Sequence, residues 1–96
     1  ALTVSVQMQA GPLRVRNWRP GDWYRPAGLK GHRKKLQDLF VDRKVERRRR
    51  HRVPVVVDAR DRVVWVVGFG LSDDFRVTEA TPSMIILTVR PLGDQL

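Results

Sequence analysis

The side chains best suited to chemistry in this chain are cations, and most of them lie in one part of the sequence. Residues 14–52 hold fifteen Lys and Arg against four acidic side chains, a net charge of +11, whereas the other residues hold four against six, a net charge of −2. Such a concentrated positive field is typical of a domain with a polyanionic partner, most often nucleic acid, because a solubilising surface tends to mix both signs. An acidic protein as the partner would explain this positive charge equally well.

No arrangement of residues in the sequence predicts catalysis. The glycine-rich motifs that bind nucleotides and the sequence context of a nucleophilic serine are both absent. His32 and His51 have no matching set of cysteines or carboxylates, so we expect no metal site. Asp73 and Asp74 could serve a small hydrolase only with perturbed titration in a cleft, and adjacent carboxylates in a loop commonly point apart. We therefore expect no catalytic residue in this chain.

The Gly28-Leu29-Lys30-Gly31 segment is a candidate phosphate-binding loop. Glycines let a backbone approach phosphate closely, and we expect this segment to open a basic helix whose free N–H groups favour anions. A G-x-x-G loop also clamps the nucleic-acid backbone in KH domains, although Pro20, Gly21 and Pro26 make the helix that precedes such a loop improbable. A plain turn that caps a helix explains the same residues as well.

A run of arginines, Arg47–Arg50 and Arg52, is the second candidate for phosphate contact. The guanidinium group suits bidentate binding of phosphate, but on a helix these side chains would spread around the circumference and some would only be solvated. Trp18 and Trp23 could stack on bases or pack over a sheet, with packing slightly favoured, whereas Trp65 is expected in the core.

Alternating apolar and polar residues predict the N-terminal elements that position these cations. Leu2–Gln9 and Leu13–Arg16 are expected to form a hairpin, or one strand interrupted by a bend. Residues 17–31 follow as an ordered, turn-rich loop. It contains a type II turn at Pro20-Gly21, beside which Asp22 can bond a backbone N–H group.

The remaining sequence predicts one or two helices and then more strands. Leu36, Leu39 and Phe40 have the spacing of an amphipathic helix of about three turns, which we place within residues 32–44. Residues 46–52 form a second short helix or an exposed turn. After these helices we expect a hairpin of Val53–Val57 and Arg62–Val67, with its second strand central in the sheet. A short strand Phe75–Val77 and a final strand Met84–Val89 follow.

Together these elements predict one α+β domain over residues 1–96, of mostly antiparallel strands with one or two short helices. No apolar run approaches the ~20 residues that span a bilayer, so no membrane partner is expected. The sequence has no cysteine, which fits a reducing compartment. Ala1 already lies inside a strand pattern, which favours a domain excised from a longer chain.

An ordered series of motifs resembles the C-terminal domain of bacterial tRNA(Ile)-lysidine synthetases over about residues 13–80. The series consists of Asn17-x-x-Pro20-Gly21-Asp22, Pro26-x-Gly28-x-x-Gly31, Lys35-Leu36-x-Asp38-x-Phe40-x-Asp42-x-Lys44, Arg52-Val53-Pro54-Val55 and Val64-Trp65-Val66-Val67-Gly68. Each piece is unspecific alone, so the order of the pieces carries the resemblance.

The resemblance implies a function that composition does not show. Enzymes of this family use ATP to adenylate the wobble cytidine of the isoleucine tRNA with a CAU anticodon, and then join lysine to it. This chain would be the non-catalytic module of such a cytoplasmic enzyme, gripping the acceptor-stem side of the tRNA. Its implied fold is a small sandwich similar to a domain of the phenylalanyl-tRNA synthetase β-subunit.

The resemblance also divides the residues by role. The family's S-G-G-x-D-S loop is absent here, so ATP and Mg²⁺ would belong to the catalytic N-terminal domain of the parent enzyme and no cofactor is expected in this chain. Gly21, Asp22, Pro26, Gly28 and Asp38 would shape loops. The expected tRNA contacts are Arg19, Arg25, Lys30, Arg33, Lys34, Lys35, Lys44, Arg47, Arg48, Arg49, Arg50 and Arg52. The alternative function is a general RNA-binding module, KH-like or ribosome-associated, that acts through Gly28–Gly31.

Overall fold

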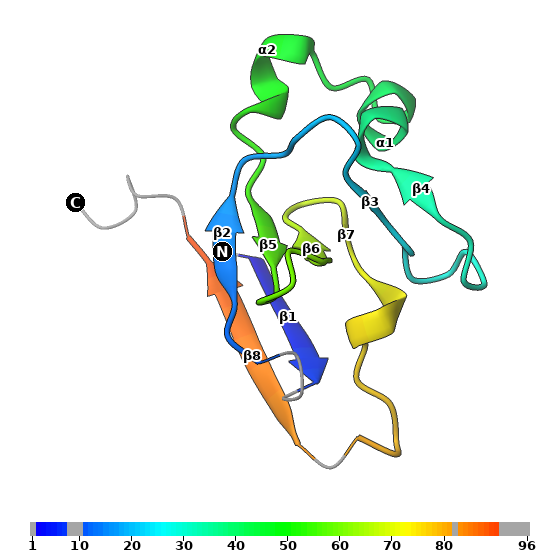
Figure 1. Ribbon diagram of the computed structural model, residues 1–96, viewed down its shortest axis with the longest axis vertical. Coiled ribbons are helices and arrows are strands. Elements are labelled where there is room, and N and C mark those ends of the chain that lie inside the picture. The colour runs from blue at the N-terminus through cyan, green and yellow to red at the C-terminus, as the bar shows by residue number, and fades with distance from the viewer. Residues whose placement is uncertain (1, 8–10, 82, 91–96) are drawn as a thin grey trace.

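The computed structural model describes residues 2–7, 11–81 and 83–90. Short strands and three short helices make up the described chain (Figure 1). In chain order they are β1 (Leu2–Gln7), β2 (Arg14–Arg16), β3 (Trp23–Tyr24), β4 (Lys34–Lys35), α1 (Leu36–Asp42), α2 (Arg47–Arg50), β5 (Val55–Val57), β6 (Val63–Val66), β7 (Gly70–Leu71), the 3₁₀ helix η2 (Asp73–Phe75) and β8 (Met84–Val89). This content confirms the predicted α+β class.

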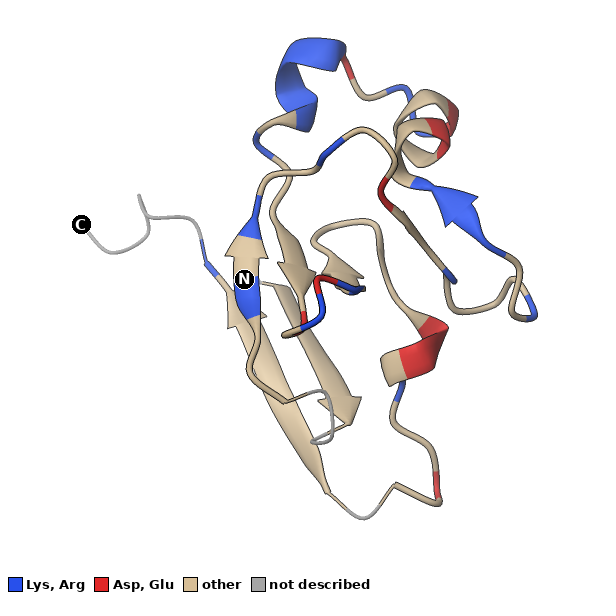
Figure 2. Cartoon of the chain, viewed as in Figure 1, with Lys and Arg blue, Asp and Glu red and all other residues tan. Residues whose placement is uncertain are grey.

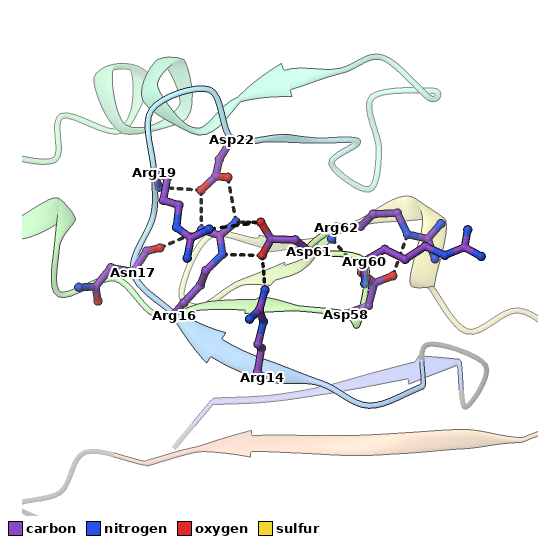
Figure 3. Close-up of polar contacts among 9 residues, drawn as sticks. All are labelled: Arg14, Arg16, Asn17, Arg19, Asp22, Asp58, Arg60, Asp61 and Arg62. Atoms are coloured by element: carbon purple, nitrogen blue, oxygen red, sulfur yellow. Dashed lines mark hydrogen bonds and ion pairs between the residues drawn. The ribbon is translucent and has the colours of Figure 1, made fainter.

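Three layers are stacked on one another, with a central antiparallel sheet in the order β2-β5-β6-β7. The β1–β8 ribbon covers one face of this sheet, and α1 with the β3–β4 ribbon covers the other. Figure 3 shows the layers from the side, with β1 and β8 below and α1 and β4 above. The loops that carry most of the cations therefore belong to the layer opposite β1–β8.

The valines of β5 and β6 explain why the central sheet is covered on both sides. Val55 and Val57 point toward α1, where they pack with Leu36, Leu39 and Phe40. Val63 and Val66 of β6 belong to the same cluster, whereas Val56, Val64 and Trp65 point to the opposite face of the sheet, toward the β1–β8 ribbon. There they form a second buried cluster with Val6 and Phe75. The predicted hairpin of these two strands, with β6 in the centre, is confirmed.

The expected N-terminal hairpin is wrong. β1 pairs with β8 in antiparallel register, from Leu2 opposite Val89 to Gln7 opposite Met84, whereas β2 pairs with β5. Alternation predicts a strand with one buried face but carries no information about its partner, and here the partner lies at the other end of the chain. Gln9, the predicted end of the first strand, lies outside the described residues.

The predicted helix within residues 32–44 exists but is shorter, because it occupies only Leu36–Asp42. It ends where Lys44 adopts a left-handed backbone conformation, with φ of 55°. The N–H of Val45 then bonds to the carbonyl of Phe40 at 2.8 Å, and the N–H of Lys44 bonds to that of Val41 at 3.0 Å. These two bonds form a Schellman motif, which stops the helix and separates α1 from α2.

The C-terminal third departs from expectation in two places. Residues 75–77 do not form the predicted strand, since Phe75 ends the 3₁₀ helix η2 and only an isolated bridge between Arg76 and Val6 follows. The short strand of this region is instead β7, at Gly70–Leu71, where no strand was predicted. The final strand is confirmed as β8.

Candidate nucleic-acid interface

Ion pairing divides the cations of this protein into two groups. In the described residues, eleven Lys and Arg form no ion pair with an acidic side chain. All but Arg60 and Arg90 lie in residues 30–52, which we call the cationic segment; its unpaired members are Lys30, Arg33, Lys35, Arg43, Lys44, Arg47, Arg49, Arg50 and Arg52. Figure 2 shows this charge on α2, on β4 and in the turns beside them, whereas the β1–β8 strands carry none.

The second group, the paired cations, includes a network of three arginines around two carboxylates, which we call the Asp61 cluster: Arg14, Arg16, Arg19, Asp22 and Asp61 (Figure 3). Arg16 donates to both oxygens of Asp22 at 2.9 Å, and its Nε donates to Asp61 at 2.9 Å. Arg14 and Arg19 also reach Asp61, at 2.9 and 3.4 Å. Each guanidinium is thus already bound by a carboxylate.

Local backbone geometry places the two carboxylates of this cluster. Asp61 lies in the β5–β6 turn with φ of 64°. Gly21 has φ of 94° and the N–H of Asp22 bonds to the carbonyl of Arg19 at 3.0 Å, as the predicted type II turn requires. The Asp22 carboxylate closes that turn by accepting the N–H of Arg19 at 2.7 Å. The expectation that Asp22 shapes the loop is consistent with these bonds.

Burial and pairing shift the pKa values of Arg16, Asp58 and Asp61. The hydrogen bonds that Arg16 donates to the Asp22 carboxylate are the main reason that the pKa of Arg16 is raised, and the side chain of Arg16 is only 9% exposed. The hydrogen bond from Arg16 in turn holds the pKa of Asp61 below its usual value. Burial alone would raise the pKa of Asp58, but N–H groups of Arg60 and Arg62 and the Arg62 guanidinium outweigh it, so this pKa is also lowered. These arginines and carboxylates are charged partners of one another at neutral pH.

The arginine run takes the helical form of the two predicted alternatives. α2 buries no side chain, so its guanidiniums are held by few contacts. Arg48 pairs with Glu46 at 3.1 Å, and Arg50 donates to the carbonyl of Val45 at 3.1 Å while its guanidinium lies 5.9 Å from the ring centre of Phe40. Arg48, Arg49 and Arg52 line a small hollow of about 220 Å³. Arg50 therefore attaches α2 to the core, and Arg47, Arg49 and Arg52 are the exposed and unpaired members of the run.

The Gly28–Gly31 loop does not open a helix, which corrects the expectation. Gly28 and Gly31 have φ of 91° and 82°, and Lys30 between them has φ of 53°. These left-handed residues reverse the chain, so the loop joins β3 to β4, and α1 begins only at Leu36. A KH-like clamp, in which such a loop connects two helices, is incompatible with this arrangement. The glycines form a turn at the tip of a two-stranded ribbon.

The three tryptophans have different surroundings. Trp65 is buried, as predicted. Trp18 packs edge-on against Phe40 with ring centres 5.5 Å apart, so of the two alternatives for this residue, packing against the core is confirmed. Trp23 instead is 40% exposed and carries the guanidinium of Arg33 at 4.2 Å from its ring centre and that of Arg25 at 5.2 Å.

Besides Arg48, three of the predicted tRNA contacts already form ion pairs with acidic side chains. Arg19 pairs with Asp61, Arg25 with Asp74 at 3.0 Å, and Lys34 with Asp42. Sequence reasoning did not single out Arg43, which is exposed and unpaired, nor the role of Asp61. The position of Asp61 in a predicted hairpin turn was the one signal that could have drawn attention to it.

The described residues contain no group of histidines, cysteines or carboxylates that could hold a metal ion. Asp73 and Asp74 form separate ion pairs, with Arg76 and Arg25, as expected of carboxylates that point apart. Within the described residues, no helix combines the length and the apolar character needed to cross a bilayer.

Comparison with known proteins gives the family. The model of the family described as "TilS substrate C-terminal domain" matches residues 13–87. The chain belongs to the TilS C-terminal domain family. Residues 13–87 include the central sheet, α1, α2 and the first four of the six residues of β8, so the family match and the resemblance in the sequence rest on the same elements.

Relatives and a solved structure agree with the TilS C-terminal family. The chain is 50% identical over 80 residues to the tRNA(Ile)-lysidine synthase of Symbiobacterium thermophilum, covering 83% of this chain and 16% of that protein. It is 42% identical over 76 residues to the tRNA(Ile)-lysidine synthase of Parabacteroides distasonis, covering 79% of this chain and 17% of the relative. A crystal structure of the TilS C-terminal domain superposes with a TM-score of 0.75 at 34% identity, covering 88% of this chain and 65% of that one. The chain thus spans about a sixth of the length of these curated relatives.

Proposed function

We propose that this domain binds tRNA, without taking part in catalysis, for an enzyme that joins lysine to the isoleucine tRNA with a CAU anticodon. The observation that carries the proposal is the grouping of cations in the cationic segment. Nine Lys and Arg of this segment have no acidic partner in the described structure. Phosphate contacts by Lys and Arg release counterions and provide most of the affinity of such interfaces. The names of the relatives supply the substrate class, tRNA.

The proposed orientation places the cationic segment against the RNA and the β1–β8 ribbon away from it. The strands of that ribbon, LTVSVQ and MIILTV, carry no charged side chain. In A-form RNA the phosphates and 2′-hydroxyl groups border a wide minor groove, which a protein reads mainly by shape. We assign the acceptor-stem side of the tRNA to this surface. The chain is then one domain of a cytoplasmic enzyme, and the catalytic N-terminal part of that enzyme binds ATP and Mg²⁺.

The experiment compares two triple variants that lower the net charge equally. Arg47→Ala/Arg49→Ala/Arg52→Ala removes three unpaired arginines of the cationic segment. Arg60→Ala/Arg76→Ala/Arg90→Ala removes three arginines outside that segment, of which Arg76 pairs with Asp73. Binding of an isoleucine tRNA is measured by fluorescence anisotropy from 50 to 300 mM salt. We expect the first variant to reduce the slope of log K against log salt by about 2 to 3, because each lost phosphate contact lowers it by roughly 0.7 to 0.9.

The control variant should bind with nearly the slope of the unmodified chain. Equal slopes for both triple variants would show that net charge alone, and not the cationic segment, determines binding. Absence of any tRNA binding at 50 mM salt by a folded chain would contradict the proposal and leave an acidic protein as the partner.

A further inference from the structure

The solvent-facing side of the β3–β4 ribbon carries an aromatic ring surrounded by cations. Trp23 lies directly opposite Lys35 in the strand register, and Arg25 and Arg33 are the next residues on the same side. The distances of 5.2 and 4.2 Å from their guanidinium carbons to the Trp23 ring centre confirm that they share this side. We call these four residues the Trp23 cluster.

The position of Trp23 is not explained by packing. Tyr24, the next residue, points to the opposite side and is 3% exposed in the core beneath the ribbon, whereas Trp23 keeps 40% of its surface exposed. Trp18 and Trp65 belong to or pack against the two core clusters, but Trp23 belongs to neither. A tryptophan held outside the core beside three cations is a feature of a binding surface.

The surroundings of the ring fit a nucleotide. Trp23, Arg33, Lys34, Lys35, Asp38 and Asp42 line an open cleft of about 610 Å³. An aromatic ring or a guanidinium plane stacks on a base, and the neighbouring Lys and Arg charges bind the phosphate that follows it. Asp38, which has no ion pair in the described structure, offers a carboxylate that can accept a hydrogen bond from an amino group of a base but repels phosphate.

Only an unpaired base can use this surface. Bases within a duplex stack on one another and present their edges to the grooves, so their faces are closed to a protein side chain. We propose that the Trp23 cluster stacks on an unpaired nucleotide at the single-stranded end of the RNA, while the arginines of α2 contact duplex phosphates. This inference rests on the proposed function and adds to it which part of the RNA each surface takes.

The test uses two RNA hairpins with the same stem, one blunt and one with a four-nucleotide single-stranded 3′ extension. Their binding to the unmodified chain, to Trp23→Ala and to Trp23→Phe is measured by fluorescence anisotropy with the label at the loop. Base stacking on an aromatic side chain changes affinity by about 5- to 150-fold per base, so we expect the unmodified chain to prefer the extended hairpin by at least about fivefold. Trp23→Ala should bind both hairpins within about twofold of each other, and Trp23→Phe should keep part of the preference.

The control is the Arg47→Ala/Arg49→Ala/Arg52→Ala variant, which should bind both hairpins more weakly and keep the preference for the extension. A preference that persists in folded Trp23→Ala, or no preference in the unmodified chain, overturns the inference and leaves the proposed function in place. Failure of the unmodified chain to bind either hairpin overturns both. A poly-glutamate peptide that binds Trp23 in place of the extension would assign the cluster to an acidic protein and overturn the inference as well.

Discussion

The Asp61 cluster and the cationic segment carry the same kind of side chain and differ in what surrounds it. Arg16 reaches two carboxylates and is 9% exposed, whereas Arg47 and Arg49 have no acidic partner and lie on a helix that buries no side chain. A carboxylate that already binds a guanidinium uses the donors that a phosphate would need. The comparison teaches that charge density in the sequence outlines a basic region, and ion pairing then selects the cations available to a ligand.

Replacing the carboxylate that holds Arg16 should give the largest effect on stability. In Asp22→Ala, Arg16 loses a bidentate partner in a partly buried site and the N–H of Arg19 loses its acceptor. We expect the free energy of unfolding to fall by about 2 kcal/mol, less than for a fully buried pair because Asp61 still binds Arg16. Urea denaturation measures this loss. The matched control Asp38→Ala removes the same charge from an exposed site and should change stability by no more than about 0.5 kcal/mol.

Acid should weaken the ion pairs of Asp58 and Asp61 and leave the unpaired cations unaffected. The pKa values of Asp58 and Asp61 are lowered in the folded chain, so their stabilising contribution is complete above the unfolded aspartate pKa of about 3.9 and is lost as the pH falls through the lower folded values. We expect the free energy of unfolding to be constant from pH 7 to about pH 5 and to decrease below pH 4. Urea denaturation of Asp61→Asn should show a smaller decrease over that range, and an identical pH profile in the variant would refute the role of Asp61.

Exchange of arginine for lysine separates shape from charge in the two regions. Arg16→Lys keeps the charge but loses the planar fork that binds both oxygens of Asp22, and should cost about 1 kcal/mol of unfolding free energy. Arg47→Lys should change stability by less than about 0.5 kcal/mol and leave the salt dependence of tRNA binding unchanged, since a lysine releases counterions equally well. A greater loss of stability in Arg47→Lys than in Arg16→Lys would reverse the assignment of the two regions.

The smallest effect is expected at the end of α1. Lys44 has φ of 55° at a position that usually carries glycine, so Lys44→Gly should relieve strain and stabilise the chain by about 0.5 kcal/mol after the greater flexibility of the unfolded glycine is counted. Lys35→Gly is the matched control, because Lys35 has φ of −71° and gains no relief. Thermal unfolding of both variants checks the difference, and a destabilised Lys44→Gly would show that the lysine side chain itself supports the helix end.

The sequence predicted the elements whose signal is local. The β-branched runs gave β5 and β6, the spacing of Leu36, Leu39 and Phe40 gave α1, and the arginine run gave a short helix as one of two alternatives. Elements that depend on distant partners were missed. β3, β4 and β7 have two residues each, too few for a periodic pattern, and the pairing of β1 with β8 has no local signal.

The candidate site was predictable in location but not in detail. The basic segment was found from charge alone, and the similarity to the TilS C-terminal family was recognised from an ordered set of motifs that the family model also covers. The separation of Arg16 from Arg47 could not be read from the sequence, because it depends on Asp61, which lies 45 residues from Arg16 along the chain. The individual tRNA contacts and the relation to a domain of phenylalanyl-tRNA synthetase stay predictions.

The β1–β8 ribbon has a consequence for how the chain is made. Its paired residues lie from 77 positions apart, Gln7 with Met84, to 87 positions apart, Leu2 with Val89. Closing a loop of that length costs about 4 kcal/mol of chain entropy before any contact compensates it. A ribosome releases β8 after β1 and the strands of the central sheet, so Val56, Val64 and Trp65 stay uncovered while that sheet is already able to form. Assembly of the outer layer is therefore the step at which a nascent chain is most exposed to association with its neighbours.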